Sequence, residues 1–137
     1  ERVVDETGDT RMLSLRRAML RMAAVVADRE GASALATGEV VGQKSSQTGP
    51  NLAVTDAAVD YPVHRPLLTW DKADVVARAR ELGTFDDATL PVGCERVAPP
   101  HPEMAGTRVA VEAAEPDDLL DHAASVARDV EVVDETE

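Results

Sequence analysis

The sequence is poor in lysine, in aromatic residues and in cysteine. Lys44 and Lys72 are its only lysines, against twelve arginines. Phe, Trp and Tyr occur once each, so the core must be built from Ala, Val and Leu. The single cysteine, Cys94, excludes an internal disulfide framework. No apolar run approaches the ~18 residues that span a bilayer and no signal peptide is visible, so we expect a cytoplasmic protein without a membrane partner.

Acidic residues are abundant instead. The 137 residues hold 26 Asp and Glu, and the net charge is −12. The length predicts one domain, and the 44% hydrophobic content excludes compositional disorder. An acidic, lysine-poor surface over an Ala/Val-rich core resembles proteins of salt-saturated cytoplasm, where a Debye length of roughly 3 Å removes most self-repulsion. We therefore expect a halophilic protein; an acidic mesophilic surface is the alternative.

The clearest predicted helix runs from Met12 to Ala27 and stops near Gly31. Its apolar stripe is expected to consist of Met12, Leu15, Met19, Met22 and Val26, at spacings of three and four. Arg17 and Arg21 would lie one turn apart on the far side, with Arg16 at the border between the faces. These arginines could equally be solvated and paired with acids such as Asp28.

Short apolar runs alternate with further helical patterns. The predicted strands are Ala32–Thr37, Val63–Leu68 and Val130–Val133. Three other helices are predicted. The first starts at Thr48 or Gly49 and ends near Asp60, and the last follows Pro116. The one between them starts at Asp71 and ends at Gly83, with an inner face of Val75, Val76, Ala79 and Leu82. Residues 84–107 are predicted to be irregular. This alternation predicts an α/β fold with a parallel sheet.

Ligands of parallel sheets lie beyond the carboxyl ends of the strands. Thr37, Gly38 and Glu39 would lie at such an end, and the string "GQKSSQT" follows them. Gly38 would allow a close backbone approach, and the amides and hydroxyls of the string can hydrogen-bond a ligand. The sequence therefore predicts a ligand site between the first strand and the next helix.

Four segments carry a resemblance to a known family: "LRRAMLRMA", "ATGEVVGQKSSQTGPNLAVTDA", "VHRPLLTWDKADVVARARELGT" and "LPVGCERVAPPHPEM". In order and spacing they resemble the carboxyl-terminal half of the catalytic domain of the tRNA 4-thiouridine synthase (tRNA sulfurtransferase) family of PP-loop ATP pyrophosphatases. The resemblance implies a doubly wound, five-stranded parallel sheet of the adenine-nucleotide α-hydrolase type. Residues 1–137 would form the distal half of that domain.

The resemblance also implies a reaction and its residues. ATP, with Mg²⁺, adenylates O4 of a tRNA uridine, and sulfur then displaces AMP to give 4-thiouridine; some relatives also serve thiamine biosynthesis. Arg16, Gly38 and Gln47 match the family's ATP contacts. Lys72 matches its functional lysine, and its first-turn helix position, which disfavours a cation, agrees with a role in stabilising charge on the departing pyrophosphate. A solvated lysine beside Asp71 and Asp74 is the alternative.

Cys94 matches a family cysteine used in sulfur handling, but a buried structural cysteine is an equal alternative because the second cysteine of a Cys–x–x–Cys pair is missing. Arg17 and Arg21 are candidate RNA contacts. The implied partners are tRNA and a sulfur-donor protein or persulfide source, and a homodimer is possible.

The sequence holds no Ser–Gly–Gly–x–Asp–Ser phosphate loop. That loop supplies backbone N–H donors to nucleotide phosphates, so we expect the isolated 137 residues to bind ATP weakly and not to modify tRNA. Two other interpretations stay open at this point. One is a non-catalytic interaction module derived from the fold, and the other is a different PP-loop enzyme, such as a 2-thiouridine synthetase.

Overall fold

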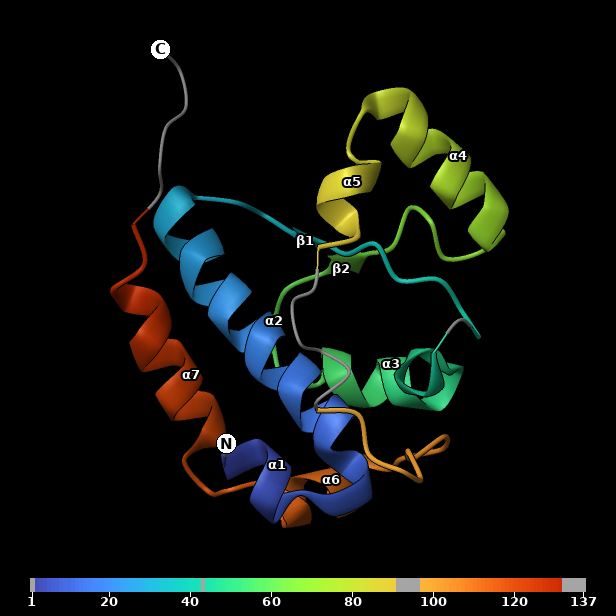
Figure 1. Cartoon of the computed structure of the whole chain (residues 1–137). Coiled ribbons are helices and arrows are strands. Elements are labelled where there is room, and N and C mark those ends of the chain that lie inside the picture. Colours follow the sequence, from blue (N-terminus) through green and yellow to red (C-terminus); the bar gives the residue numbers. More distant parts are fainter. Residues whose placement is uncertain (1, 43, 91–96, 132–137) are drawn as a thin grey trace.

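The computed structural model describes residues 2–42, 44–90 and 97–131 (Figure 1). In chain order its elements are α1 (Arg2–Glu6), η1 (Gly8–Thr10), α2 (Arg11–Glu30), β1 (Leu35–Ala36), η2 (Ser45–Gln47), α3 (Gly49–Asp56), β2 (Val63–His64), α4 (Lys72–Leu82), α5 (Phe85–Ala88), α6 (Arg108–Ala114) and α7 (Leu119–Arg128). The predicted α/β class with parallel strand pairing is confirmed. No helix within the described ranges combines the length and apolar character needed to cross a membrane.

The long helix α2 runs through the middle of the molecule, with α7 along one side and α3 on the other (Figure 1). It ends as predicted at Gly31, whose φ of 68° places it in the left-handed region that glycine adopts without strain. Its buried residues are Leu13, Ser14, Arg17, Leu20, Ala24 and Ala27. The small alanines of this face meet the buried alanines of α7, which allows the two helices to pack closely.

The predicted apolar stripe is therefore not the face that this helix buries. Met19 is 59% exposed, and Met12, Leu15, Met22 and Val26 are only half-buried. The helix carries two apolar faces, and the spacing alone does not distinguish the one that packs from the one left open. The partner helix decides, and α7 covers the alanine face.

The sheet is small among the described residues. β1 and β2 pair in parallel, with Leu35 opposite Val63 and Ala36 opposite His64. Both strands are shorter than predicted. Beyond the strand ends, the Val41 N–H donates to the Leu68 carbonyl over 2.9 Å, so the segments that follow the two strands continue side by side.

Two predicted helices are confirmed with adjusted ends. α3 begins after Thr48, which accepts the Asn51 N–H, but it ends at Asp56 rather than near Asp60. α4 runs from Lys72 to Leu82 and stops at Gly83, whose φ is 75°. The predicted inner face of α4 is wrong for Leu82, which is 61% exposed, and α4 buries none of its residues.

The buried core joins three helices through Leu13, Val54 and Val111, from α2, α3 and α6. The short α5 lies within residues 84–107, which were predicted to be irregular, and α6 begins directly after them. Gly106 lies against this core, where a Cβ would approach Leu13 Cδ1 to 2.8 Å, so a larger residue here would force the Leu13 side chain to shift. Val130 and Glu131 are not in a strand, and the rest of the predicted Val130–Val133 strand lies outside the described residues.

Candidate functional site

A cavity of about 720 Å³ lies along the open apolar face of α2, a size suited to a small-molecule ligand. Its lining comes from α2, from the segment after β1, from η2 and from residues 98–102. The lining residues are Met12, Leu15, Arg16, Met19, Leu20, Ala23, Thr37, Glu39, Lys44, Ser46, Gln47, Ala98, Pro99 and Pro102. One wall is thus apolar and rich in methionine, and the other carries amide, hydroxyl and charged groups.

Gly38 is exposed in the extended segment after β1, between the lining residues Thr37 and Glu39. Its φ lies outside the left-handed region, and an added Cβ would meet no atom within 4 Å. Neither backbone strain nor packing within the chain therefore requires glycine here. The open backbone is accessible to a ligand that approaches from outside.

Arg16 and Gln47, two of the predicted nucleotide contacts, lie together in the cavity wall. Arg16 Nη1 donates to Glu39 Oε1. With its amide oriented to satisfy both neighbours, Gln47 donates to the Val40 carbonyl over 2.7 Å and accepts from Arg16 Nη2 over 3.0 Å. The guanidinium is thus held from two sides, while 22% of the Arg16 side chain stays exposed.

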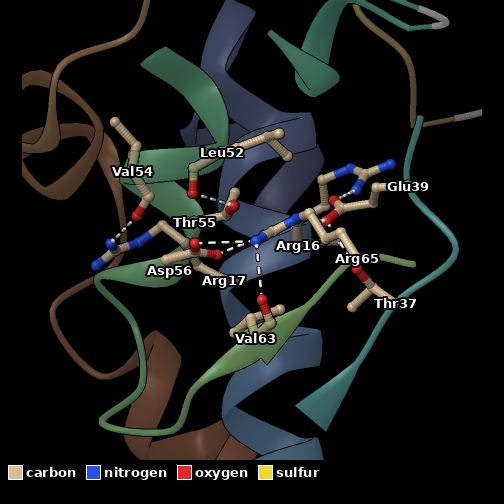
Figure 2. Close-up of polar contacts among 10 residues, drawn as sticks. All are labelled: Arg16, Arg17, Thr37, Glu39, Leu52, Val54, Thr55, Asp56, Val63 and Arg65. Carbon is tan, nitrogen blue, oxygen red and sulfur yellow. Dashed lines mark hydrogen bonds and ion pairs between the residues drawn. The ribbon is translucent and has the colours of Figure 1, made fainter. Parts of the chain in front are cut away.

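Glu39 is itself held by a second arginine (Figure 2). It is 8% exposed, and its Oε2 accepts from Arg65 Nε over 2.6 Å and from Thr37 Oγ1 over 3.0 Å. Arg65 Nη1 also donates to Asp56 Oδ2 over 3.0 Å, and Nη2 donates to the other oxygen of the same carboxylate. Carboxylate and guanidinium therefore alternate from the end of α3 to the cavity wall. We call Asp56, Arg65, Glu39 and Arg16 the ion-pair chain.

Arg17 follows Arg16 in sequence but points into the core. It is 1% exposed, and it donates to Glu115 Oε1 over 2.8 Å, to Glu112 Oε1 over 3.0 Å and to the Val54 carbonyl over 3.0 Å. The alternative in which Arg17 is solvated and paired with acids such as Asp28 is wrong, because Arg17 is buried and its acidic partners come from α6 and the residue after it. Its burial also argues against the predicted RNA contact. Arg21 is half-buried on α2.

The two lysines differ in position. Lys44 lines the cavity, whereas Lys72, the first residue of α4, is exposed and does not line it. Gly38 lies two residues after the end of β1, and Lys72 lies eight residues after the end of β2. Cys94, the predicted sulfur-handling residue, lies outside the described residues.

Glu39, Arg65 and Asp56 were not predicted to be site residues. Glu39 stands in the quoted Thr–Gly–Glu motif, and Arg65 follows directly after the second strand, so charge at strand ends was the available signal. Their pairing joins positions 26 and 9 residues apart, which no local pattern reveals.

The described lining does not fit a Mg²⁺ site held by the protein. Glu39 is its only carboxylate, and both oxygens accept hydrogen bonds from Arg16, Arg65 and Thr37. Mg²⁺ prefers several free oxygen ligands in octahedral geometry. No group of three or more His, Cys, Asp or Glu suited to a metal occurs in the part of the chain that the structure describes.

Known proteins resemble this chain in sequence. Residues 2–119 match the profile of the family described as "Thiamine biosynthesis protein (ThiI)". A probable tRNA sulfurtransferase of Halobacterium salinarum is 54% identical over 129 residues, which cover 94% of this chain and 33% of the relative. A probable tRNA sulfurtransferase of Thermus thermophilus is 43% identical over 102 residues, covering 73% of this chain and 25% of the relative.

A solved structure resembles it in fold as well. The crystal structure of a 4-thiouridine synthetase–RNA complex with bound ATP matches with a TM-score of 0.76 at 32% identity, covering 90% of this chain and 33% of that one. The chain thus spans between one quarter and one third of the length of these relatives.

Proposed function

The chain belongs to the thiamine biosynthesis protein (ThiI) family, and from this premise we propose that its 137 residues supply the distal half of a PP-loop domain that thiolates tRNA. In the proposed reaction, ATP adenylates O4 of a tRNA uridine and sulfur then displaces AMP, leaving 4-thiouridine. Relatives named tRNA sulfurtransferase and a neighbour solved with RNA and ATP support this choice over the 2-thiouridine and non-catalytic alternatives.

One observation carries the proposal. Arg16 and Gln47 lie in contact in the wall of a cavity of about 720 Å³, beside the open backbone of Gly38 at the carboxyl end of β1. We assign these three residues to ATP. The apolar wall of Met12 and Met19 offers a surface for adenine, and the amide and guanidinium offer hydrogen bonds to its polar edges or the ribose.

The remaining site residues have different supports. Lys72, the exposed first residue of α4, would stabilise charge on the departing pyrophosphate as a compact, mobile ammonium. Arg21 stays the candidate RNA contact on α2, and Cys94 the candidate sulfur-handling residue. The proposed setting is the cytoplasm, with tRNA and a sulfur-donor protein or persulfide source as partners; a homodimer stays a prediction.

Lys72→Ala in a full-length sulfurtransferase carrying this sequence tests the assignment. We expect 4-thiouridine formation in tRNA to fall by about 10²-fold or more, the usual loss when a group stabilising transition-state charge is removed. Arg78→Ala is the matched control, because Arg78 is an exposed cation of the same helix that pairs with Glu81 one turn away. Unchanged thiolation in the Lys72 variant would remove that lysine from the mechanism.

A further inference from the structure

The ion-pair chain reaches the cavity from outside it. Of its four members, Arg16 and Glu39 line the cavity, whereas Arg65 and Asp56 do not. We propose that Arg65 and Asp56 are positioning residues for the nucleotide, acting through Glu39 on Arg16. This inference rests on the proposed function, in which Arg16 contacts ATP.

Arg16 needs such support because its side chain is long and only partly covered. A free arginine side chain populates many rotamers, and a ligand that fixes it in one of them has to overcome the lost entropy. Contacts from Glu39 on one side and Gln47 on the other fix the guanidinium before a ligand arrives. Preorganised donors lose less entropy when they bind.

Glu39 in turn cannot hold this geometry alone. It is buried, and a buried carboxylate is stable only when its charge is paired and its oxygens are hydrogen-bonded. Arg16 binds one oxygen, Oε1, and Arg65 binds the other, Oε2, over 2.6 Å. Without Arg65, the carboxylate would lose the partner that sets its orientation, and Arg16 would move with it.

Arg65 is oriented from its other end by Asp56. The carboxylate of Asp56 receives both terminal nitrogens of Arg65, a fork geometry that fixes the plane of the guanidinium (Figure 2). The Arg65 side chain is 8% exposed, whereas that of Asp56 is 40% exposed. The ion-pair chain therefore connects the end of α3 and the segment after β2 to a residue of α2. Its central pair, Arg65 and Glu39, is the most buried and is the one that solvent and salt screen least.

The test uses the full-length sulfurtransferase and ATP as the varied substrate. For Arg65→Met, Arg65→Lys and Asp56→Asn we expect the KM for ATP to rise, about tenfold for Arg65→Met, because small misplacements of a binding group cost up to ~10²-fold. The kcat at saturating ATP and the KM for tRNA should change less than threefold. Asp56→Asn keeps the shape of a side chain that is 40% exposed, so this variant should fold. Its KM for ATP therefore tests the positioning role even if Arg65→Met does not fold.

A double-mutant comparison separates positioning from general stability. If Arg65 acts through Arg16, then Arg16→Ala with Arg65→Met should raise the KM for ATP no further than Arg16→Ala alone. Additive effects would overturn the inference, because a structural role would add to any other loss. Glu115→Gln is the matched control: it alters the separate buried pair of Arg17 and should shift the melting temperature without raising the KM for ATP.

The failures are distinguishable. If Arg16→Ala leaves the KM for ATP unchanged, the proposed nucleotide site itself is wrong. If Arg16→Ala raises it but the Arg65 and Asp56 variants do not, only the positioning role is wrong.

Discussion

Arg16 and Arg17 are neighbours with different environments. One step along a helix turns a side chain by about 100°, so Arg16 reaches the cavity and Arg17 enters the core. The burial of Arg17 and its partners shifts the pKa values of the two carboxylates that pair with it. Burial raises the pKa of Glu115 above the ordinary value of 4.5, against the opposing attraction of Arg17. The pKa of Glu112 is lowered, first by its hydrogen bond with Arg108 and then by Arg17.

These opposite shifts predict opposite pH dependences of stability. The stability from Glu115, whose pKa is raised, is present below pH 4.5 and is lost as pH rises through its folded-state value. The wild type should therefore lose free energy of unfolding relative to Glu115→Gln between pH 4 and 7. Gln keeps an acceptor for Arg17 Nε.

Glu112→Gln is the matched control with the reverse sign. The stability from Glu112 is present above pH 4.5 and is lost as pH falls through its lowered value. Urea unfolding of the three proteins at several pH values measures both slopes. Parallel slopes for the two variants would contradict this account.

At the scale of elements, helix starts were read from the sequence better than helix faces. α3 begins where Thr48 and Pro50 predict, because capping is local chemistry: the Thr48 hydroxyl accepts the Asn51 N–H. The same hydroxyl also donates to the Met104 carbonyl over 2.7 Å, and the Asn51 amide binds the Glu103 carbonyl and the Gly106 N–H. The start of α3 thus anchors a segment more than fifty residues away, beside the cavity-lining prolines.

Thr48→Ala should therefore destabilise the protein by about 1–2 kcal/mol, since it removes both a helix cap and a hydrogen bond to a distant carbonyl. Thr48→Ser keeps the hydroxyl and should lose less than half as much. The midpoint of urea denaturation measures the difference. Equal losses in the two variants would show that the methyl group, rather than the hydroxyl, stabilises this junction.

On the scale of the whole molecule, the charge of −12 is distributed over a surface with few lysines. Its self-repulsion falls when salt shortens the Debye length from about 10 Å at 0.1 M to about 3 Å at 1 M. The buried pairs of Arg17 and Arg65 are screened much less, so they persist in high salt. Salt should then weaken the repulsion between surface carboxylates while the attraction within the buried ion pairs persists.

We accordingly expect the unfolding temperature to rise between 0.1 and 2 M KCl. Neutralising three exposed carboxylates, by Asp60→Asn, Asp129→Asn and Glu131→Gln, should raise stability at 0.1 M KCl and flatten the salt dependence. Thermal unfolding followed by circular dichroism measures both. A melting temperature independent of KCl would show that the acidic surface does not strain the fold.

The sequence alone determined the features that depend on near neighbours along the chain. Gly31, Gly83 and Thr48 mark helix ends through backbone conformation and capping, and the motif strings predict the family. Only the tertiary structure decided which face of α2 is buried and which charged residues pair with Glu39. The pairing of Asp56, Arg65, Glu39 and Arg16 depends on three segments meeting in space, and the charges of such residues carry no information about distance until the chain has folded.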